Sequence, residues 1–543
     1  LNTTGTCFTI NASNIVLDCD GFTINYSQGR NGHAVVANAT NNLTIKNCEI
    51  VNEYAVVNNS YALNFTNTNN SLVLNNNITV VGNSSGGVLM TFSVNNTIRN
   101  NSITTTGAGA FKVGVTIAYN ARNNTVINNS IRIAGDNTRN YGINVTQNSN
   151  GTLLADNRIV TNGNTRSYGI LLEFGGNNVI ANSTISTNGS ADRNYGILFT
   201  QDADDVVTRN TIMTNGTRLN VGIFPFGRGG NTFSSNIIAT AGTADDNVGI
   251  VLFTVINSIV RDNRINSTGT QDNEGILLQD GSNGNLVTNN TIRTQGQSDL
   301  NHGIQVYFSS SGNSNNIISA NVITTNGTTL NTGIHLDTGS YNTTIANNTI
   351  TTRGTQGNNH GIFINGTGSG VVVRNNTIST NGTNDNHGVV IAGHADNASV
   401  QNTNISTRGI GSYGIFIQTS NGSTFNNTLL SNPTQWLFTD ATTNVTLFNT
   451  SFVALNTTLR FAGAMIANNS FNVTRTTLAL SHNAAFLNAS NLSFMNTSAN
   501  ITFRDITVTA PAATVDIDDD GTFEECDESV CSNQLLSGTT FTF

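Results

Sequence analysis

The residues best placed to do chemistry lie near the carboxyl end, in "DIDDDGTFEECD" (516–527). Their spacing is that of a D-x-D-x-D-G calcium loop, in which alternating oxygen ligands converge on one hard cation and glycine permits the sharp turn. The candidate ligands are Asp516, Asp518, Asp520, Thr522, Glu524 and Asp527. The last of them is Asp where such loops usually have Glu, and no helical pattern flanks the segment. The sequence therefore predicts either a Ca²⁺ site or a solvated acidic turn.

Carboxylates elsewhere do not form a clear catalytic set. Glycosidic hydrolysis needs two of them about 5 to 10 Å apart over a groove. The acids that can share a face are Asp202, Asp204 and Asp205 with Glu173, and Asp246 with Asp272. No lysine accompanies either group, since the chain has only Lys46 and Lys112. We expect no catalytic residues and no enzymatic activity.

Three histidines, His302, His360 and His387, recur at one position of an internal repeat. Such a column can hold a metal ion, because imidazole is a common ligand. Stacked histidines at the edge of a repeat are the alternative, and we favour that interpretation.

Asparagine carries a second kind of chemistry, covalent N-glycosylation. The chain has about 40 Asn-x-Ser/Thr sequons. In five of them the acceptor is the first Asn of an Asn-Asn pair, and the acceptors are Asn100, Asn128, Asn289, Asn347 and Asn375. Adjacent residues of a strand face opposite sides, so these acceptors are predicted to point outward while the second Asn of each pair points inward. Turn chemistry alone is the competing reason for the pairs. Covalent N-glycans predict an extracellular protein on the cell surface.

The cysteines agree with that location. Cys7 and Cys19 flank the first repeat and are predicted to form a disulfide, and Cys526 and Cys531 are predicted to close a small loop. Cys48 is left over and is expected to be a buried free thiol.

These residues must be positioned by a repeat of about 27 residues, whose fixed point is a glycine in segments such as "RNYGIN" (139–144), "RSYGIL" (166–171) and "RNYGIL" (193–198). A second column, Asn two residues before an apolar residue, lies half a period away, as in Asn101 with Ile103. Each unit holds three short alternating stretches separated by Asn, Gly and Ser, and no window has a helical period. The pattern predicts an all-β fold, a right-handed parallel β-helix solenoid with about 27 residues per coil and a small C-terminal β region.

Successive copies of one position then lie about 4.8 Å apart, so identical residues form ladders. The inward Asn is expected to bond the backbone of neighbouring coils and the next Asn. The glycine is expected to supply a backbone angle that a Cβ would resist. Tyr141, Tyr168 and Tyr195, with an Arg two residues before each, are interpreted as stacked side chains of ordinary solenoid architecture rather than a binding site.

The segments "ASNIVLDCDGFTI" (12–24) and "ATNNLTIKNCEI" (39–50), together with the NNTI motifs, resemble the pectate-lyase-like right-handed β-helices, and among them the repeats of the NosD and CASH carbohydrate-associated proteins. The resemblance covers roughly residues 1–430 and implies the fold, not an activity. The tail, "DDDGTFEECDESVC" to "TFTF", resembles the closing region of large archaeal surface proteins.

Domain boundaries are predicted from the decay of the period: a regular β-helix over 1–430, less regular coils over 431–510, and an acidic C-terminal segment over 511–543. The net charge of −9 argues against nucleic acid as a partner, and no run is apolar enough to span a membrane. The terminal "SGTTFTF" (537–543) is an uncharged alternating strand that can pair with the edge of a neighbouring molecule, which predicts head-to-tail self-assembly; pairing within its own tail is the alternative.

Two classes of function remain. The first is an extracellular structural surface glycoprotein, such as an envelope, filament or adhesin subunit in contact with cell-surface components. The second is a polysaccharide-binding or polysaccharide-cleaving β-helix. An acidic or aromatic groove running over several coils distinguishes the second class from the first.

Overall fold

The computed structural model describes residues 1–54, 59–107, 109, 111–135, 139–308, 310–366, 370–440, 443–517 and 522–543. The chain divides into two compact units, Leu1–Asn316 and Ile317–Phe543. Among the described residues, the one helical segment is the 3-10 turn η1 (Ser493–Met495). The fold is an all-β parallel solenoid, as the repeat predicts.

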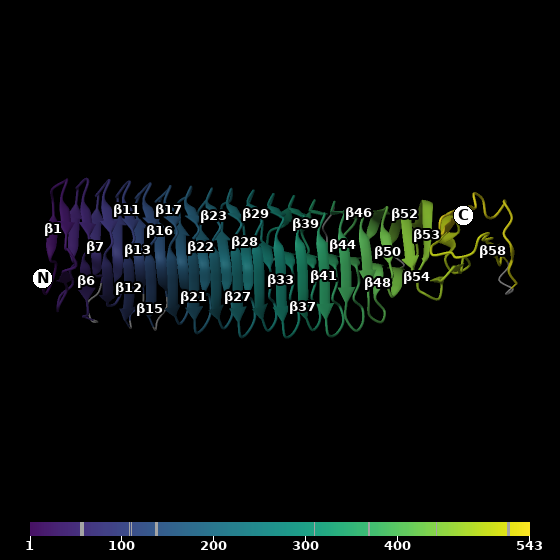
Figure 1. Ribbon diagram of the computed structural model, residues 1–543, viewed down its shortest axis with the longest axis horizontal. Coiled ribbons are helices and arrows are strands. Elements are labelled where there is room, and N and C mark those ends of the chain that lie inside the picture. Colours follow the sequence, from purple (N-terminus) through teal and green to yellow (C-terminus); the bar gives the residue numbers. More distant parts are fainter. Residues whose placement is uncertain are drawn as a thin grey trace. The chain divides into compact units, whose positions relative to one another are not determined.

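One coil of the first unit consists of β16 (Asn140–Thr146), β17 (Leu153–Ala155) and β18 (Arg158–Gly163), and the next of β19 (Ser167–Glu173), β20 (Val179–Ala181) and β21 (Thr184–Gly189) (Figure 1). Each strand pairs in parallel with its counterpart one coil later. The register aligns Ile143 with Ile170 and Ile159 with Ile185. Equal repeat positions therefore stack directly on one another.

The strands that begin at the glycine column form one face of each unit. In the first unit they are β7 (Tyr61–Thr66), β10 (Gly86–Thr91), β13 (Lys112–Ala118), β16, β19, β22 (Tyr195–Thr200), β25 (Val221–Phe226), β28 (Val248–Phe253), β31 (Ile276–Gln279) and β34 (Ile304–Tyr307). In the second unit they are β38 (Ile334–Leu336), β42 (Ile362–Asn365), β45 (Val389–Ala392), β48 (Tyr413–Ile417) and β51 (Gln435–Thr439). We call these the glycine-face strands.

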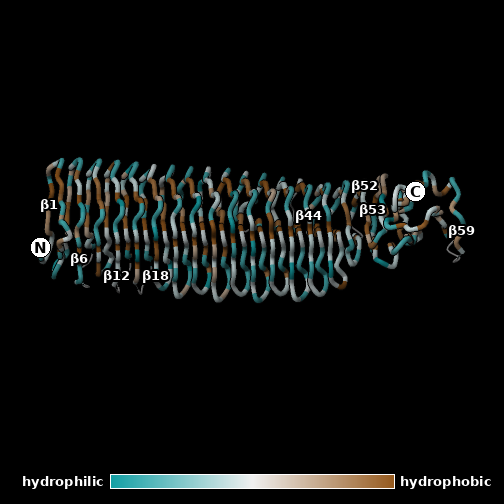
Figure 2. Tube along the Cα trace, in the orientation of Figure 1, coloured by the Kyte–Doolittle hydropathy of each residue, from teal (hydrophilic) through white to brown (hydrophobic). Residues whose placement is uncertain are grey.

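The core of the first unit is a stack of aliphatic side chains that recur once per coil. The isoleucine column, with Ile131, Ile159, Ile212 and Ile265 among its members, is 0 to 1% exposed. Figure 2 shows the same regularity, since the hydrophobic positions recur at the same place in successive coils. These strands are too short to form a stable hairpin alone. Burial of one such apolar column on each face stabilises their stacking into coils.

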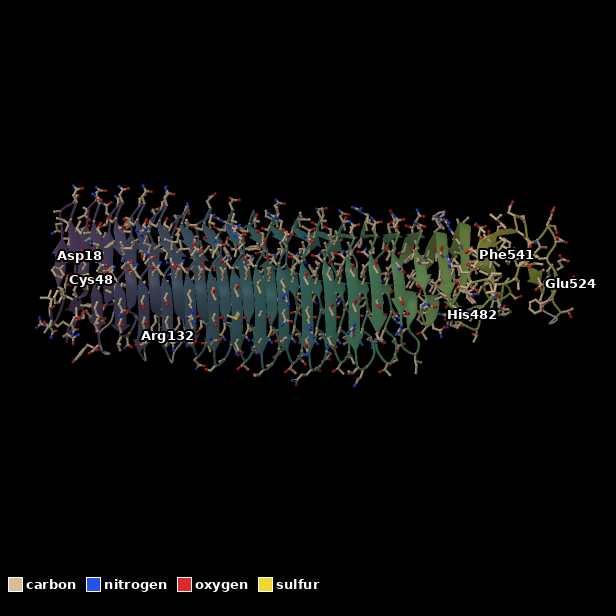
Figure 3. All side chains as sticks on the ribbon, viewed as in Figure 1. Asp18, Cys48, Arg132, His482, Glu524 and Phe541 are labelled. Atoms are coloured by element: carbon tan, nitrogen blue, oxygen red, sulfur yellow. A yellow bond between two sulfur atoms is a disulfide. The ribbon has the colours of Figure 1, made fainter. Side chains whose placement is uncertain are left out.

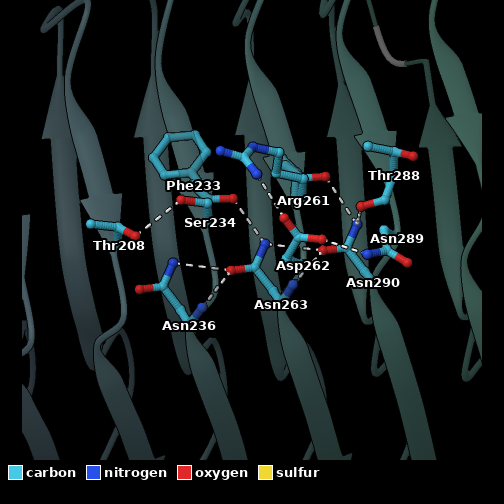
Figure 4. Close-up of polar contacts among 11 residues, drawn as sticks. Thr208, Phe233, Ser234, Asn236, Arg261, Asp262, Asn263, Thr288, Asn289 and Asn290 are labelled. Carbon is cyan, nitrogen blue, oxygen red and sulfur yellow. Dashed lines mark hydrogen bonds and ion pairs between the residues drawn. The ribbon is translucent and has the colours of Figure 1, made fainter.

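The inward asparagines form the predicted ladder (Figure 4). The Oδ1 atom of Asn263 accepts hydrogen bonds from the backbone N–H and the Nδ2 of Asn236, at 2.9 and 3.0 Å. Its own Nδ2 donates to the carbonyl of Phe233 at 2.9 Å and to Oδ1 of Asn290 at 3.0 Å. Each Asn thus satisfies backbone groups that the turn leaves unpaired.

The glycine column has a different cause from the one expected. Gly142, for example, does not adopt a positive φ. A Cβ built on it would lie 2.3 Å from Cγ2 of Ile159 and 2.5 Å from the carbonyl oxygen of Gly169. The constraint is therefore space inside the coil, because the backbone passes too close to the isoleucine column and to the next glycine for any side chain.

The coil pattern changes after β51 in the second unit. The long strands β52 (Asn444–Ala454) and β53 (Thr457–Ala467) pair antiparallel, and β53 pairs antiparallel with β57 (Ala499–Phe503). The terminal strand β61 (Thr540–Thr542) pairs antiparallel with β57 and with β60 (Leu535–Ser537). Phe541, labelled in Figure 3, is 4% exposed and packs in a small cluster with Ile506. The terminal strand is thus engaged in its own tail, the alternative to an intermolecular role.

Candidate ligand-binding groove

A hollow of about 750 Å³ lies on the outward side of the glycine-face strands β16, β19, β22 and β25. Its floor contains side chains of the outward positions of these strands, while inward positions such as Ile143 and Val145 fill the core. The lining residues are Phe111, Arg139, Tyr141, Asn144, Arg166, Tyr168, Leu171, Glu173, Arg193, Tyr195, Leu198, Thr200, Leu219, Phe224 and Phe226. We call this hollow the Tyr–Arg groove.

The three tyrosines form the predicted stack. The ring centroids of Tyr141 and Tyr168 are 5.3 Å apart at 13°, and those of Tyr168 and Tyr195 are 5.1 Å apart at 2°. Phe224, which lies opposite Leu198 in the register, makes an edge contact with Tyr195 at 5.3 Å. The parallel register places the tyrosine rings directly over one another, one per strand. The stack therefore follows from the repeat itself.

The arginines form a second row beside the tyrosines. Arg139, Arg166 and Arg193 each lead into a glycine-face strand with a left-handed backbone, at φ of 67°, 54° and 61°. The guanidinium of Arg139 lies 4.8 Å from the centre of the Phe111 ring. Within the described parts of the chain, no ion pair involves any of the three. The groove is thus bordered by three guanidinium groups without a carboxylate partner, on a chain whose net charge is negative.

Burial sets the protonation of the tyrosines. It raises the pKa of Tyr141, Tyr168 and Tyr195 above the ordinary phenol value, and the neighbouring arginines lower the pKa by less. The phenols therefore stay neutral at physiological pH. Their hydroxyls make no hydrogen bond to another described residue and are not fully buried. They remain available to donate to and accept from a ligand.

Comparison with models of protein families identifies the fold type of the region that carries the groove. Residues 141–314 match the model described as "Right handed beta helix region". The repeat region is a right-handed parallel β-helix. The groove lies on this β-helix, whose glycine-face strands supply its floor.

Solved structures with similar folds include the periplasmic alginate epimerase AlgG, at 17% sequence identity and a TM-score of 0.34, covering 71% of this chain and 77% of that one. The Dettilon tailspike protein matches at 11% identity and a TM-score of 0.39, over 77% and 80% of the two chains. The hyperthermoactive exopolygalacturonase from Thermotoga maritima matches at 11% identity and a TM-score of 0.32, over 65% and 88%. No curated protein sequence matches this chain. The resemblance of the tail to archaeal surface proteins has no support from these comparisons.

The carboxylates singled out in the sequence meet only in separate pairs among the described residues: Asp202 interacts with Asp205, and Asp246 acts on Asp272. Glu173 lines the groove, where its Oε2 accepts a hydrogen bond from the Thr146 hydroxyl at 3.2 Å. Asp202 and Asp205 are buried in the turn after β22, and Asp204 is exposed. Glu173 thus stands in the groove without a second carboxylate among the described lining residues.

Asp205 replaces an asparagine of an inward ladder. Its Oδ1 accepts a hydrogen bond from the backbone N–H of Asn178 at 2.8 Å, and its own N–H donates to Oδ1 of Asn231 at 2.9 Å. Burial raises the pKa of Asp205 to about 9, and the adjacent Asp202 adds to the shift. A protonated Asp205 offers an acceptor oxygen as Asn does, with one donor fewer, and its contacts with Asn178 and Asn231 give it a structural role.

Sequence reasoning missed Glu274, which is 6% exposed and occupies the column position directly before Gly275, where other coils have Tyr, His, Val or Thr. Burial raises its pKa to about 8, and the charges of Asp272 and Asp246 add to the shift. Burial also raises the pKa of Asp272 to about 6. Alignment of the column before the glycine would have shown Glu274 as the acidic member of a series of Tyr, His, Val and Thr residues.

The disulfide prediction for the amino-terminal end is wrong in its pairing. Cys19 is bonded to Cys48, with their Cα atoms 4.7 Å apart, and Cys7 is the free thiol (Figure 3). Cys48 occupies an inward ladder position, where its N–H donates to Oδ1 of Asn76, so it faces Cys19 one strand spacing away. Cys7 precedes β1 (Phe8–Ile10) and Cys19 follows β2 (Val16–Asp18), strands that belong to different sheets. The predicted Cys526–Cys531 disulfide is present.

The other predicted sites have mixed outcomes. All five glycan acceptors are exposed and the second Asn of each pair is at most 2% exposed. Asp518 and Asp520 of the calcium loop lie outside the described residues, so this site stays a prediction; of its other members, Asp527 accepts hydrogen bonds from the N–H and hydroxyl of Ser529, which lower its pKa. No described helix is long and apolar enough to cross a membrane.

Proposed function

We propose that this β-helix is an extracellular protein that binds an acidic polysaccharide along the Tyr–Arg groove. The observation that carries the proposal is the row of three guanidinium groups without carboxylate partners, repeated once per strand beside three stacked tyrosines. Successive strands are about 4.8 Å apart, so the row presents positive charge at a regular interval. A polymer with a carboxylate or sulfate on successive sugars is complementary to that arrangement, and arginine is the residue best suited to bind such groups in a bidentate manner.

The groove supports binding better than cleavage. Its phenols are neutral at neutral pH and burial raises their pKa further, so they are poor general bases there. Glu173 has no second carboxylate among the described lining residues, and hydrolysis by the common two-carboxylate mechanism needs such a pair. The neutral hydroxyls instead serve as hydrogen-bond partners for sugar oxygens between the arginine contacts.

The experiment is a titration of the full chain with oligogalacturonate, an acidic probe, and with a neutral oligosaccharide of equal length. Arg166→Gln should weaken binding of the acidic probe about 10-fold to 100-fold, the value of one charge-assisted hydrogen bond. Arg132→Gln is the matched control, because Arg132 is exposed on β15 (Ser130–Gly135) and does not line the groove (Figure 3). Equal affinities of the two variants, or no preference for the acidic probe, would contradict the proposal.

A structural role as a surface glycoprotein is the second candidate, and a separate observation favours it. The acceptors Asn100, Asn128, Asn289, Asn347 and Asn375 are exposed, and so is the Ser or Thr two residues after each of them. An oligosaccharyltransferase needs access to both groups, so the geometry permits N-glycans. The two disulfides agree with an oxidising compartment. Glycopeptide mass spectrometry of the native protein tests this role, and five unmodified acceptors would remove its main support.

A further inference from the structure

A second and smaller groove, of about 320 Å³, lies on the outward side of the glycine-face strands β42, β45 and β48 in the second unit. His360 and His387 occupy the column position directly before the glycine, which holds tyrosines in the Tyr–Arg groove. Phe363, Phe416 and Asp385 also line this groove. We call it the His–Phe groove. No lysine or arginine lines it, so its chemistry differs from that of the arginine-bordered groove.

The aromatic rings of this groove form an ordered stack. The rings of His360 and His387 are 5.1 Å apart at 5°, and those of His387 and Phe416 are 4.5 Å apart at 5°. Phe363 contacts His360 edge-on at 5.5 Å. Phe363 and Phe416 are both half-buried, so part of each ring faces the groove. The groove therefore offers flat apolar surface over three successive strands.

Backbone hydrogen bonds fix the tautomer of both histidines. The N–H of His387 donates to Nδ1 of His360 at 3.2 Å, and the N–H of Tyr413 donates to Nδ1 of His387 at 3.0 Å. An Nδ1 that accepts a hydrogen bond carries no proton, so in each neutral ring the proton is on Nε2. Burial lowers the pKa of His360 well below its usual range and that of His387 to about 4, which keeps both rings neutral.

Both Nε2–H groups are free to serve a ligand. No hydrogen bond between described residues uses either atom, and neither is among the fully buried unpaired atoms of that part of the chain. The stack places the two donors about one strand spacing apart. Among the other lining residues, Asp385 supplies a carboxylate, and the exposed Asn358 and Gln418 supply amides.

The stacking also rules out a shared metal ion for these two rings. One Zn²⁺ requires both imidazole nitrogens at about 2.0 to 2.1 Å, hence within about 4 Å of each other. Rings that are parallel with centroids 5.1 Å apart cannot direct equivalent nitrogens to one such point. The described residues also contain no group of three side chains suited to a metal.

We propose that the His–Phe groove binds a neutral oligosaccharide, whose ring faces pack on Phe363 and Phe416 while its hydroxyls accept from the Nε2–H groups of His360 and His387. Sugar hydroxyls both donate and accept, which matches two N–H donors opposite a carboxylate and amides. The absence of a lining cation disfavours an acidic ligand, and two outward N–H donors disfavour a cationic one. This site stands on residues 358–418 and does not depend on the Tyr–Arg groove.

The test uses the full chain and three sets of hexasaccharide probes: neutral cello-, manno- and xylohexaose, cationic glucosamine hexamer, and acidic galacturonate hexamer. Calorimetry measures affinity, and ¹⁵N-histidine NMR reports which rings are contacted. At the His–Phe groove, followed through the Nε2 resonances of His360 and His387, a neutral probe should bind more tightly than the cationic or the acidic hexamer. No binding by any neutral probe, or tighter binding of the cationic hexamer at this groove, would overturn the proposal.

The variant His387→Val preserves the fold, because Val221 and Val248 occupy the same column position in other coils. It should weaken the neutral probe at least about 10-fold, the value of one hydrogen bond with its packing contact. His482→Val is the matched control, since His482 is exposed in the turn between β55 (Leu478–Ser481) and β56 (Ala484–Leu487) (Figure 3). Asp385→Asn, a change at a partly exposed site, should also weaken binding of the neutral probe, and it does not disturb the aromatic stack. Equal affinities of the His387 and His482 variants would refute the assignment.

Discussion

The inward asparagine ladder allows a quantitative test at Asn263. Replacement by Leu keeps the number and branching of the side-chain heavy atoms and removes every hydrogen bond of the side chain. The backbone N–H of Asn236 and one of its two amide N–H groups lose their acceptor, at 2.9 and 3.0 Å, and the carbonyl of Phe233 loses a donor at 2.9 Å; the other amide N–H still donates to Val207. Asn236 is 1% exposed, so water cannot replace the lost partner without opening the coil.

The magnitude follows from the two orphaned donors on Asn236. Each buried donor left unpaired costs about 1 to 3 kcal/mol, so Asn263→Leu should destabilise this coil by about 2 to 6 kcal/mol. Hydrogen exchange, followed by mass spectrometry on peptides spanning 232–242, measures the stability of this coil locally. A local measurement is suitable because a solenoid does not unfold as one unit. Exchange limited by opening of this coil should accelerate by roughly 30-fold to more than 10⁴-fold.

The control is Asn289→Gly in unglycosylated protein. Asn289 is exposed at a left-handed backbone position, φ 55°, and its Nδ2 donates to Asp262 at 2.5 Å. Glycine accepts that backbone angle, so the change should alter stability by no more than about 0.5 kcal/mol. If Asn263→Leu leaves exchange within threefold of the wild type while Asn289→Gly behaves as expected, the ladder does not hold the coils together and the reasoning fails.

Further expectations concern other columns. Gly222→Ala should destabilise by about 1 to 3 kcal/mol or more, because its Cβ would lie 2.3 Å from Cγ2 of Ile238, whereas Gly463→Ala, whose nearest contact is 3.7 Å, should be near neutral in thermal unfolding. Burial raises the pKa of Glu274 in the folded state, so between pH 4.5 and about 8 the folded protein holds a proton that the unfolded chain releases, and the wild type loses stability as pH rises through this window. Glu274→Gln removes this loss and should therefore stabilise the protein increasingly from about pH 4.5 towards pH 8. Equal pH profiles of unfolding for the two proteins would contradict this. Cys48→Ser should accelerate exchange in residues 12–50 and leave the rest unchanged, and a global effect would argue against a local role. Calcium should protect the tail around Asp516 from proteolysis in a chelator-sensitive way, and no protection would favour the solvated turn.

Much of the fold could be read from the sequence because one repeat position experiences one environment. The period predicted the inward asparagines and the Tyr141–Tyr168–Tyr195 stack, because a parallel register places equal repeat positions of successive coils directly beside one another. The Cys19–Cys48 pair was missed because it depends on which sheet the strand before each cysteine joins.

The candidate sites were less predictable. The Tyr–Arg groove depends on how the turns that carry Arg139, Arg166 and Arg193 border the strands. The residue types alone do not predict a groove there. The donor character of His360 and His387 depends on two backbone hydrogen bonds that form only in the stacked register. Whether a repeated side chain can contact a ligand therefore depends on its tertiary contacts and not on composition.

The outward asparagines impose an occupancy rule on any glycans they carry. Asn100 and Asn128 lie on successive coils, and Nδ2 of Asn128 donates to Oδ1 of Asn100 at 2.9 Å. A sugar attached to either amide nitrogen is wider than the strand spacing of about 4.8 Å. Neighbouring acceptors therefore compete for the same space, as particles do on a one-dimensional lattice with nearest-neighbour exclusion. A glycan at Asn100 would lower the probability of one at Asn128, and the pair Asn347 and Asn375, joined by the same kind of bond at 3.2 Å, would show the same anticorrelation.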